Sequence, residues 1–205
     1  MYIPKINLTT NKTEIVEFMK RFSFATLITS KDNFPTATNL PFVVTVRDDN
    51  VVLTSHFAKA NEHWKDVENS IVLVIFSEPH AYISTTNYEN ELNVPTWNYI
   101  SIHAYGQGKI ITDTEQTFAI LESTIKNYEN EYLQQWNSFP EDYKLKKSKG
   151  IVAIEILVTD LQAKKKLSQN RTDSEQKKII DTLSKSSNSN ENIIAEYMKL
   201  NVKGK

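Results

Sequence analysis

The sequence contains no cysteine and only four glycines among its 205 residues. Without cysteine, disulfides, thiol nucleophiles and zinc sites built on thiolates are excluded. The few glycines form no P-loop, no dinucleotide-binding fingerprint and no G-x-S-x-G elbow of a serine hydrolase. Acyl transfer by such a serine and nucleoside-triphosphate chemistry are therefore excluded. The formal net charge of −1 also argues against a protein that coats a polyanion.

Long apolar runs are absent as well. The N-terminal stretch MYIPKINLTT lacks a basic start followed by an apolar core, and no run approaches the length of a membrane span. We therefore expect a cytoplasmic protein. A hydrophobic content of 40% in a chain of 23.6 kDa is enough for a full core, and it predicts one domain with an appendage.

The residue pattern predicts a mainly β protein with helices, that is, an α+β fold. Short β-rich runs fill residues 24–76 and return in residues 80–111, with the turn signals KDNFP and RDDN between the first of them. Helices are predicted over 11–22 and 113–132, each opened by a capping pair. After Arg171 the sequence becomes helical and polar, and Thr172 and Glu175 form a further capping box. Residues 172–205 are thus predicted to be a helical appendage of unknown role.

One stretch, LTSHFAKANEHW (residues 53–64), concentrates polar side chains before a predicted short helix. A metal ion shared by His56 and His63 is not expected, because seven residues on one continuous helix span roughly 10 Å. Phosphate binding is the remaining chemistry. The donors would be Thr54, Ser55, Lys59 and the free N–H groups of a helix that begins near Ala60.

The alternative for this stretch is structural. Ser55 and Asn61 would then cap the helix, and Lys59 would be solvated; the spacing leaves both interpretations open. A second candidate is VPTWNYISIHAYGQG (residues 94–108), which brings Trp97, Asn98 and further aromatic rings into one strand region. These rings could equally be ordinary core and cross-strand pairs.

Five ordered blocks resemble the PaiB-type family, the FMN-binding negative transcriptional regulators of bacteria. The blocks are MYIP, TSHFAKANEHW, PHAYIS, VPTWNYISIHAYG and KKKLSQNR, and they cover about residues 1–171. The resemblance implies a six-stranded antiparallel FMN-binding split β-barrel, related to pyridoxamine-phosphate oxidases and flavin reductases. It further implies a homodimer with flavin at each subunit interface, and a domain boundary between residues 1–171 and 172–205.

The resemblance also implies a set of FMN-binding residues. The segment TSHFAKAN would bind the phosphate, and TATNLP would run along the flavin ring and ribityl chain. The segment TWN would be contributed by the partner subunit, and KLSQN would form the last, C-terminal contact of the site. The residues so assigned are Thr38, Asn39, Leu40, Thr54, Ser55, His56, Lys59, Asn61, Trp97, Asn98, Lys166, Ser168 and Gln169. The related oxidases carry an arginine near TATNLP that is absent here, so their substrate chemistry is not carried over.

Three functions compete at this point. The resemblance favours an FMN-binding regulator, with DNA as a partner, although nothing in the sequence indicates a helix-turn-helix. The implied fold favours a flavin-dependent oxidoreductase, and a binding or storage module is the third alternative. Basic runs at residues 144–149 and 164–166 would support DNA contact if they shared one face; otherwise they are solvated surface.

Overall fold

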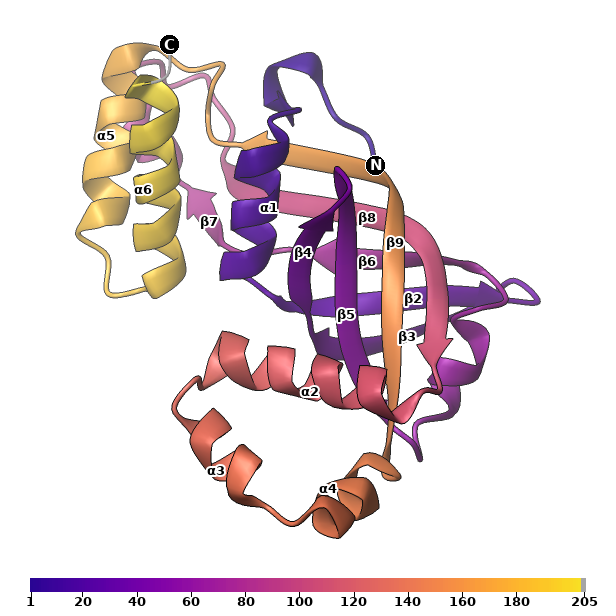
Figure 1. Ribbon diagram of the computed structural model, residues 1–205. Helices are drawn as coiled ribbons and strands as arrows, with labels where there is room; N and C mark the ends of the chain where they lie inside the picture. The colour runs from indigo at the N-terminus through magenta and orange to yellow at the C-terminus, as the bar shows by residue number, and fades with distance from the viewer. Residues whose placement is uncertain (204–205) are drawn as a thin grey trace. The chain divides into compact units, whose positions relative to one another are not determined.

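The computed structural model describes residues 1–203 (Figure 1). It is an α+β structure. The helical elements in chain order are η1 (Lys5–Asn7), α1 (Lys12–Arg21), η2 (Glu62–Asp66), η3 (Thr85–Asn87), α2 (Thr114–Tyr128), α3 (Tyr132–Ser138), α4 (Glu141–Ser148), α5 (Asp173–Ser184) and α6 (Ser189–Lys203), where η marks a 3-10 helix. The strands are β1 (Leu8–Thr9), β2 (Phe24–Lys31), β3 (Phe34–Pro41), β4 (Val43–Arg47), β5 (Asn50–Ala58), β6 (Ile71–Phe76), β7 (His80–Ile83), β8 (Thr96–Ile111) and β9 (Ile151–Lys166). In the described part of the chain, no helix combines the length and the apolar character needed to cross a membrane.

Nine strands of the described chain form one antiparallel sheet. Its order is β3-β2-β6-β8-β9-β5-β4, with β1 paired to β9 and β7 paired to β8. The family resemblance implied six strands, and this number is not confirmed. Strand β1 is only two residues long, and such a short pairing gives little alternation for a sequence pattern to detect, whereas β7 falls in the β-rich run predicted from residue 80.

Two tight hairpins organise the first half of the sheet. Asp32 and Asn33 have φ of 51° and 63° between β2 and β3, and Asp48 and Asp49 have φ of 48° and 61° between β4 and β5. Two central residues with positive φ match the twist of antiparallel strands, and Asn and Asp tolerate this conformation. The turn signals KDNFP and RDDN are therefore confirmed, each as a two-residue connection.

The chain divides into two compact units, and the larger consists of residues 12–76 and 103–161. The inner side chains of its strands, among them Leu27, Phe57, Val74 and Ile154, are fully buried. On the opposite side of β9, Ala153 packs with Ile111 and with Ile120 of α2. The capping pair predicted at the start of α2 is confirmed, since the Asp113 carboxylate accepts a hydrogen bond from the Gln116 N–H at 2.9 Å. Helices α3 and α4 follow α2 before the chain enters β9 (Figure 1).

The second unit consists of residues 1–11, 77–102 and 162–205. Its C-terminal helices α5 and α6 pack against each other, α6 contacts β7, and α5 contacts η3. The predicted capping box at Thr172 and Glu175 opens α5. The Glu175 carboxylate is buried and also accepts a hydrogen bond from the Glu89 N–H at 3.0 Å. The predicted picture of a separate appendage is therefore not confirmed, because these helices share a unit with residues 77–102.

Candidate functional site

Residues 53–58 lie in strand β5. Polar side chains that are neighbours in the sequence therefore point to opposite faces of this strand. Side chains alternate between the two faces of a strand, so Thr54 and His56 point to the face opposite Ser55. Ser55 is buried and donates a hydrogen bond to the Pro41 carbonyl at 2.7 Å. His56 lies opposite Ala153 on the face that α2 covers. The side chains of this segment are thus divided between both faces of β5.

The short helix expected near Ala60 is present. It is the 3-10 helix η2, which has five residues and begins at Glu62. The Asn61 side chain caps it by accepting a hydrogen bond from the His63 N–H at 3.2 Å. Of the N–H groups that were expected to face an anion, that of His63 is already bonded to the Asn61 side chain. The capping interpretation of Asn61 is confirmed.

A buried network joins η2 to strands β2 and β3. The imidazole of His63 is hydrogen bonded on both nitrogens, through Nδ1 to the Thr38 hydroxyl at 2.8 Å and through Nε2 to the Thr29 hydroxyl at 2.9 Å. The Asn61 amide donates to the same Thr38 hydroxyl at 3.2 Å. Burial lowers the pKa of His63, and the nearby Asp66 carboxylate opposes this shift. The network thus holds a neutral imidazole between two strands.

Strand β3 presents its predicted flavin contacts on two different faces. Thr38 faces inward to His63, and Leu40, two residues further, faces the same way and is buried. Asn39 faces outward and accepts a hydrogen bond from the Thr26 hydroxyl of β2 at 2.8 Å. Because β3 ends the strand order of the described chain, its outer edge also leaves backbone groups for a ligand or another chain.

Around Asn39 lies a surface that we call the outer sheet face. It is formed by the outward side chains of β3, β2 and β6, and its apolar members are Phe24, Ile28, Ile71, Leu73 and Ile75. Phe24 is 69% exposed and Ile71 is 61% exposed, and the other three are half-buried. Polar Asn39 and Thr26 lie among them. An apolar face of this kind is typical of a surface that binds a ligand or another protein chain.

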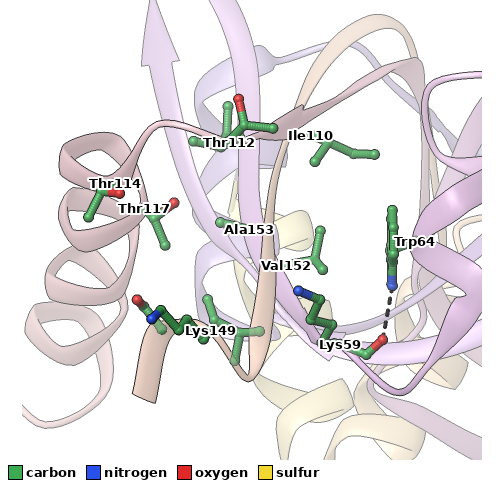
Figure 2. A pocket seen from close by; sticks show the side chains of 12 residues that line it. Lys59, Trp64, Ile110, Thr112, Thr114, Thr117, Lys149, Val152 and Ala153 are labelled. Atoms are coloured by element: carbon green, nitrogen blue, oxygen red, sulfur yellow. Dashed lines mark hydrogen bonds between the residues drawn. The ribbon is translucent and has the colours of Figure 1, made fainter. Parts of the chain in front are cut away.

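Lys59 lies in a pocket at the end of β5 (Figure 2). The Lys59 carbonyl accepts a hydrogen bond from Trp64 Nε1 at 3.1 Å, and the Lys59 N–H donates to the Gly150 carbonyl at 2.9 Å. Lys149 and several threonines line the same pocket. Sequence reasoning identified Lys59 as a candidate binding residue but missed Lys149. The hydrogen bond from the Lys59 N–H to the Gly150 carbonyl connects residues that are 91 positions apart, and local spacing cannot predict such a contact.

The remaining predicted residues belong to the second unit, and most of them bind one another. Asn98 is completely buried, and its amide forms hydrogen bonds with the Ser168 hydroxyl at 3.0 and 3.1 Å. The Lys166 ammonium donates to the Thr96 hydroxyl, and burial lowers its pKa. The Gln169 side chain accepts a hydrogen bond from the Leu167 N–H at 2.7 Å. The contacts of Asn98 with Ser168 and of Lys166 with Thr96 connect the end of β9 to the start of β8.

Trp97 differs from these neighbours because its side chain is accessible. It is 51% exposed and lies edge-on to the Tyr82 ring, with centroids 5.7 Å apart, and near His80 at 5.8 Å. The interpretation of this region as cross-strand aromatic pairs is confirmed for Trp97 and Tyr82, which are register partners of β8 and β7. The exposed part of the indole remains available to a ligand or a partner.

Comparison with known proteins identifies the family of this chain. The model of a family described as "Putative FMN-binding domain" matches residues 1–160. The protease synthase and sporulation protein PAI 2 of Bacillus subtilis is 39% identical over 203 residues, which cover 97% of each chain. Both matches confirm the PaiB-type resemblance found in the sequence, and they agree with FMN as the expected cofactor.

Solved structures of low sequence identity share the fold. The FAD- and heme-binding protein of Mycobacterium smegmatis superposes with a TM-score of 0.61 at 13% identity, covering 78% of this chain and 73% of that one. The flavocytochrome Anf3 of Azotobacter vinelandii gives a TM-score of 0.58 at 12% identity, covering 80% and 72%. The architecture described above is therefore one in which flavin proteins are known.

Proposed function

Because the chain belongs to the family of the FMN-binding domain that matches residues 1–160, we propose that it is an FMN-binding negative regulator of transcription that acts as a homodimer. The observation that carries this proposal is the near-full-length similarity to PAI 2, at 39% identity. That relative is named for protease synthesis and sporulation. A regulator of this kind would act on DNA in the cytoplasm.

The outer sheet face and Lys59 carry the side-chain types that suit a flavin mononucleotide. An isoalloxazine ring is flat and largely apolar with polar edges, and the outer sheet face offers apolar side chains around the amide of Asn39. Lys59 supplies a positive charge suited to the phosphate. The bound flavin would provide reversible electron transfer, while the protein sets its binding and orientation.

The split barrel and the dimer are the structural parts of this proposal. Strands β3 and β5, which stand near opposite ends of the strand order, contact each other, as a curled sheet requires. A second copy on the outer sheet face would remove Phe24 and Ile71 from water, which favours association. The exposed Trp97 fits the role that the family resemblance gives it, as a residue offered to the flavin of the partner.

A flavin-dependent oxidoreductase is the second candidate. What favours it is the fold shared with a flavocytochrome and with an FAD- and heme-binding protein, both named for redox cofactors. In that case the flavin would exchange electrons with a reductant and a substrate rather than serve as a ligand of a regulator.

The test compares these two functions on the same FMN-loaded preparation. Fluorescence anisotropy would follow binding to DNA from upstream of the protein's own gene, with a scrambled duplex as control. For a regulator we expect preference for the upstream fragment and affinity that falls steeply with salt, because phosphate contacts release counterions. No preference at any salt concentration, together with oxidation of NADH or NADPH well above that of free FMN, would instead support the oxidoreductase.

A further inference from the structure

The pocket beside Lys59 brings together two lysines from distant parts of the chain. It has a volume of about 330 Å³ and lies between the end of β5, the end of β8, the start of α2 and the turn from α4 into β9 (Figure 2). The two lysines are Lys59 and Lys149. Strand pairing of β5 with β9 holds them there, since the Lys59 N–H donates to the carbonyl of Gly150, the residue after Lys149.

The charge of this pocket is uncompensated. Its lining residues include both lysines and no aspartate or glutamate. Within residues 1–203, neither lysine forms an ion pair. An anion in this pocket would be attracted by both ammonium groups. Both lysines are exposed, and the pocket offers an anion two positive charges and no carboxylate in its lining.

Some hydroxyl groups of the pocket already donate a hydrogen bond within the protein, and others do not. The Thr117 hydroxyl donates to the Asp113 carbonyl at 2.8 Å, and the Ser148 hydroxyl donates to the Leu145 carbonyl at 3.0 Å. In the described chain the hydroxyls of Thr112 and Thr114 have no hydrogen-bond partner, so both can donate to a ligand. Two ammonium groups and two hydroxyls form a donor set suited to the several oxygens of a phosphate.

Part of the pocket wall is apolar. It includes the Trp64 ring and the side chains of Ile110 and Val152. Figure 2 shows the Trp64 ring standing beside Lys59, held by the hydrogen bond from its Nε1 to the Lys59 carbonyl. Apolar surface next to a cationic end suits a phosphate that is esterified to an organic group better than a bare inorganic ion.

From these features we propose that the pocket binds a phosphate monoester, with Lys149 as a second cation beside Lys59. Two sources share this chemistry. One is the phosphate of FMN, an assignment that rests on the proposed function; the other is a separate phosphorylated ligand that binds together with the flavin. Lys149 is the informative residue, because Lys59 alone was suggested by the sequence.

The experiment uses Lys149→Ala, with Lys146→Ala as the matched control. Lys146 is an exposed lysine of α4 that does not line the pocket, so its removal makes the same change of charge three residues away. Binding of FMN and of riboflavin would be followed by quenching of flavin fluorescence. Binding of inorganic phosphate to the FMN-saturated protein would be followed by calorimetry, and thermal melting would confirm that both variants fold.

If the pocket holds the phosphate of FMN, Lys149→Ala weakens FMN binding about tenfold or more, because a charge-assisted hydrogen bond is lost, and leaves riboflavin binding unchanged. If it holds a separate phosphate ester, FMN binding is unchanged, and the FMN-saturated wild type binds inorganic phosphate in a saturable way that Lys149→Ala abolishes. Either result supports the inference. It is overturned if Lys149→Ala alters neither titration, or if Lys146→Ala alters them equally. A wild type that binds phosphate here but no flavin would refute the proposed function and leave this inference standing.

Discussion

Thr38 Oγ1 and His63 Nδ1 lie 2.8 Å apart in the interior of the larger unit. This contact gives Thr38 a structural partner on η2, and His63 reaches Thr29 on β2 with its other nitrogen. The imidazole is therefore the polar link between β2, β3 and the helix that precedes β6. Either neutral tautomer satisfies both contacts, because a threonine hydroxyl can donate or accept.

His63→Ala should destabilise the protein strongly. The change leaves the Thr29 hydroxyl, which is 2% exposed, without its partner and opens a cavity beside Phe57. The expected loss is about 2–4 kcal/mol of unfolding free energy. Urea denaturation would measure it, with His80→Ala, a change at an exposed histidine of β7, as the control. Equal unfolding midpoints for the two variants would contradict the role given to the network.

The free energy of unfolding should decrease as the pH falls below neutrality. Burial lowers the pKa of His56 and of His63, so the unfolded chain takes up protons on these residues at a higher pH than the folded one does. The stabilisation is present above the unfolded pKa of about 6.5 and is lost as the pH falls from there toward the folded pKa values.

Urea midpoints at about pH 7.5 and pH 5.5 would test this pH dependence, since the window lies above the ordinary range of carboxylates. In His56→Leu the difference between the two midpoints should shrink, because one of the three histidines whose pKa burial lowers, His56, His63 and His103, is gone. A wild-type midpoint that is the same at both values, or higher at the lower one, would rule out this account of the histidines.

Substitution of Asn98 should lower stability, whereas substitution of its neighbour Trp97 should lower FMN affinity. Asn98 is completely buried and bonded to Ser168, so Asn98→Ala should cost about 1–3 kcal/mol of stability and leave FMN affinity of the folded protein within about twofold. Trp97 is half exposed, so Trp97→Ala should hardly change stability. It should weaken FMN binding by up to about tenfold if its ring contacts the flavin. Paired melting curves and FMN titrations would decide, and loss of FMN affinity in Asn98→Ala at unchanged stability would reverse the assignment.

The outer sheet face should control dimer formation. Ile71→Asp places a charge on this face at a side chain that is 61% exposed, so the fold should tolerate it. We expect the variant to sediment as a monomer at a micromolar concentration at which the wild type is a dimer. Val46→Asp is the control, because Val46 is also an exposed apolar residue but belongs to β4, at the opposite end of the strand order from β3. A dimeric Ile71→Asp would show that the subunits associate elsewhere.

Local features of the fold could be predicted from the sequence because they depend on neighbouring residues. The caps at Asp113 and Thr172 and the two hairpin turns are of this kind. The strand character of β5 was predicted only as far as Ser55, in the run VVLTS, because the polar residues that follow hide the alternation. The grouping of its side chains around one ligand was therefore not a safe inference from spacing alone.

The candidate site was only partly predictable, because several of its contacts join distant segments. Lys59 and Asn39 could be proposed from the family resemblance of their own segments. Lys149, by contrast, reaches its pocket through the pairing of β5 with β9, and His63 meets Thr38 only once β3 and η2 are in place. The packing of α5 against η3 likewise depends on long-range contacts that no local pattern encodes.

Binding of FMN itself is the central claim, and the visible absorption spectrum tests it most directly. The purified protein would be incubated with excess FMN, freed of unbound flavin by gel filtration, and its flavin absorbance compared with its protein concentration. The account predicts a yellow protein with about one FMN per subunit, and much weaker retention of riboflavin, which lacks the phosphate. A protein that stays colourless after this treatment would contradict it.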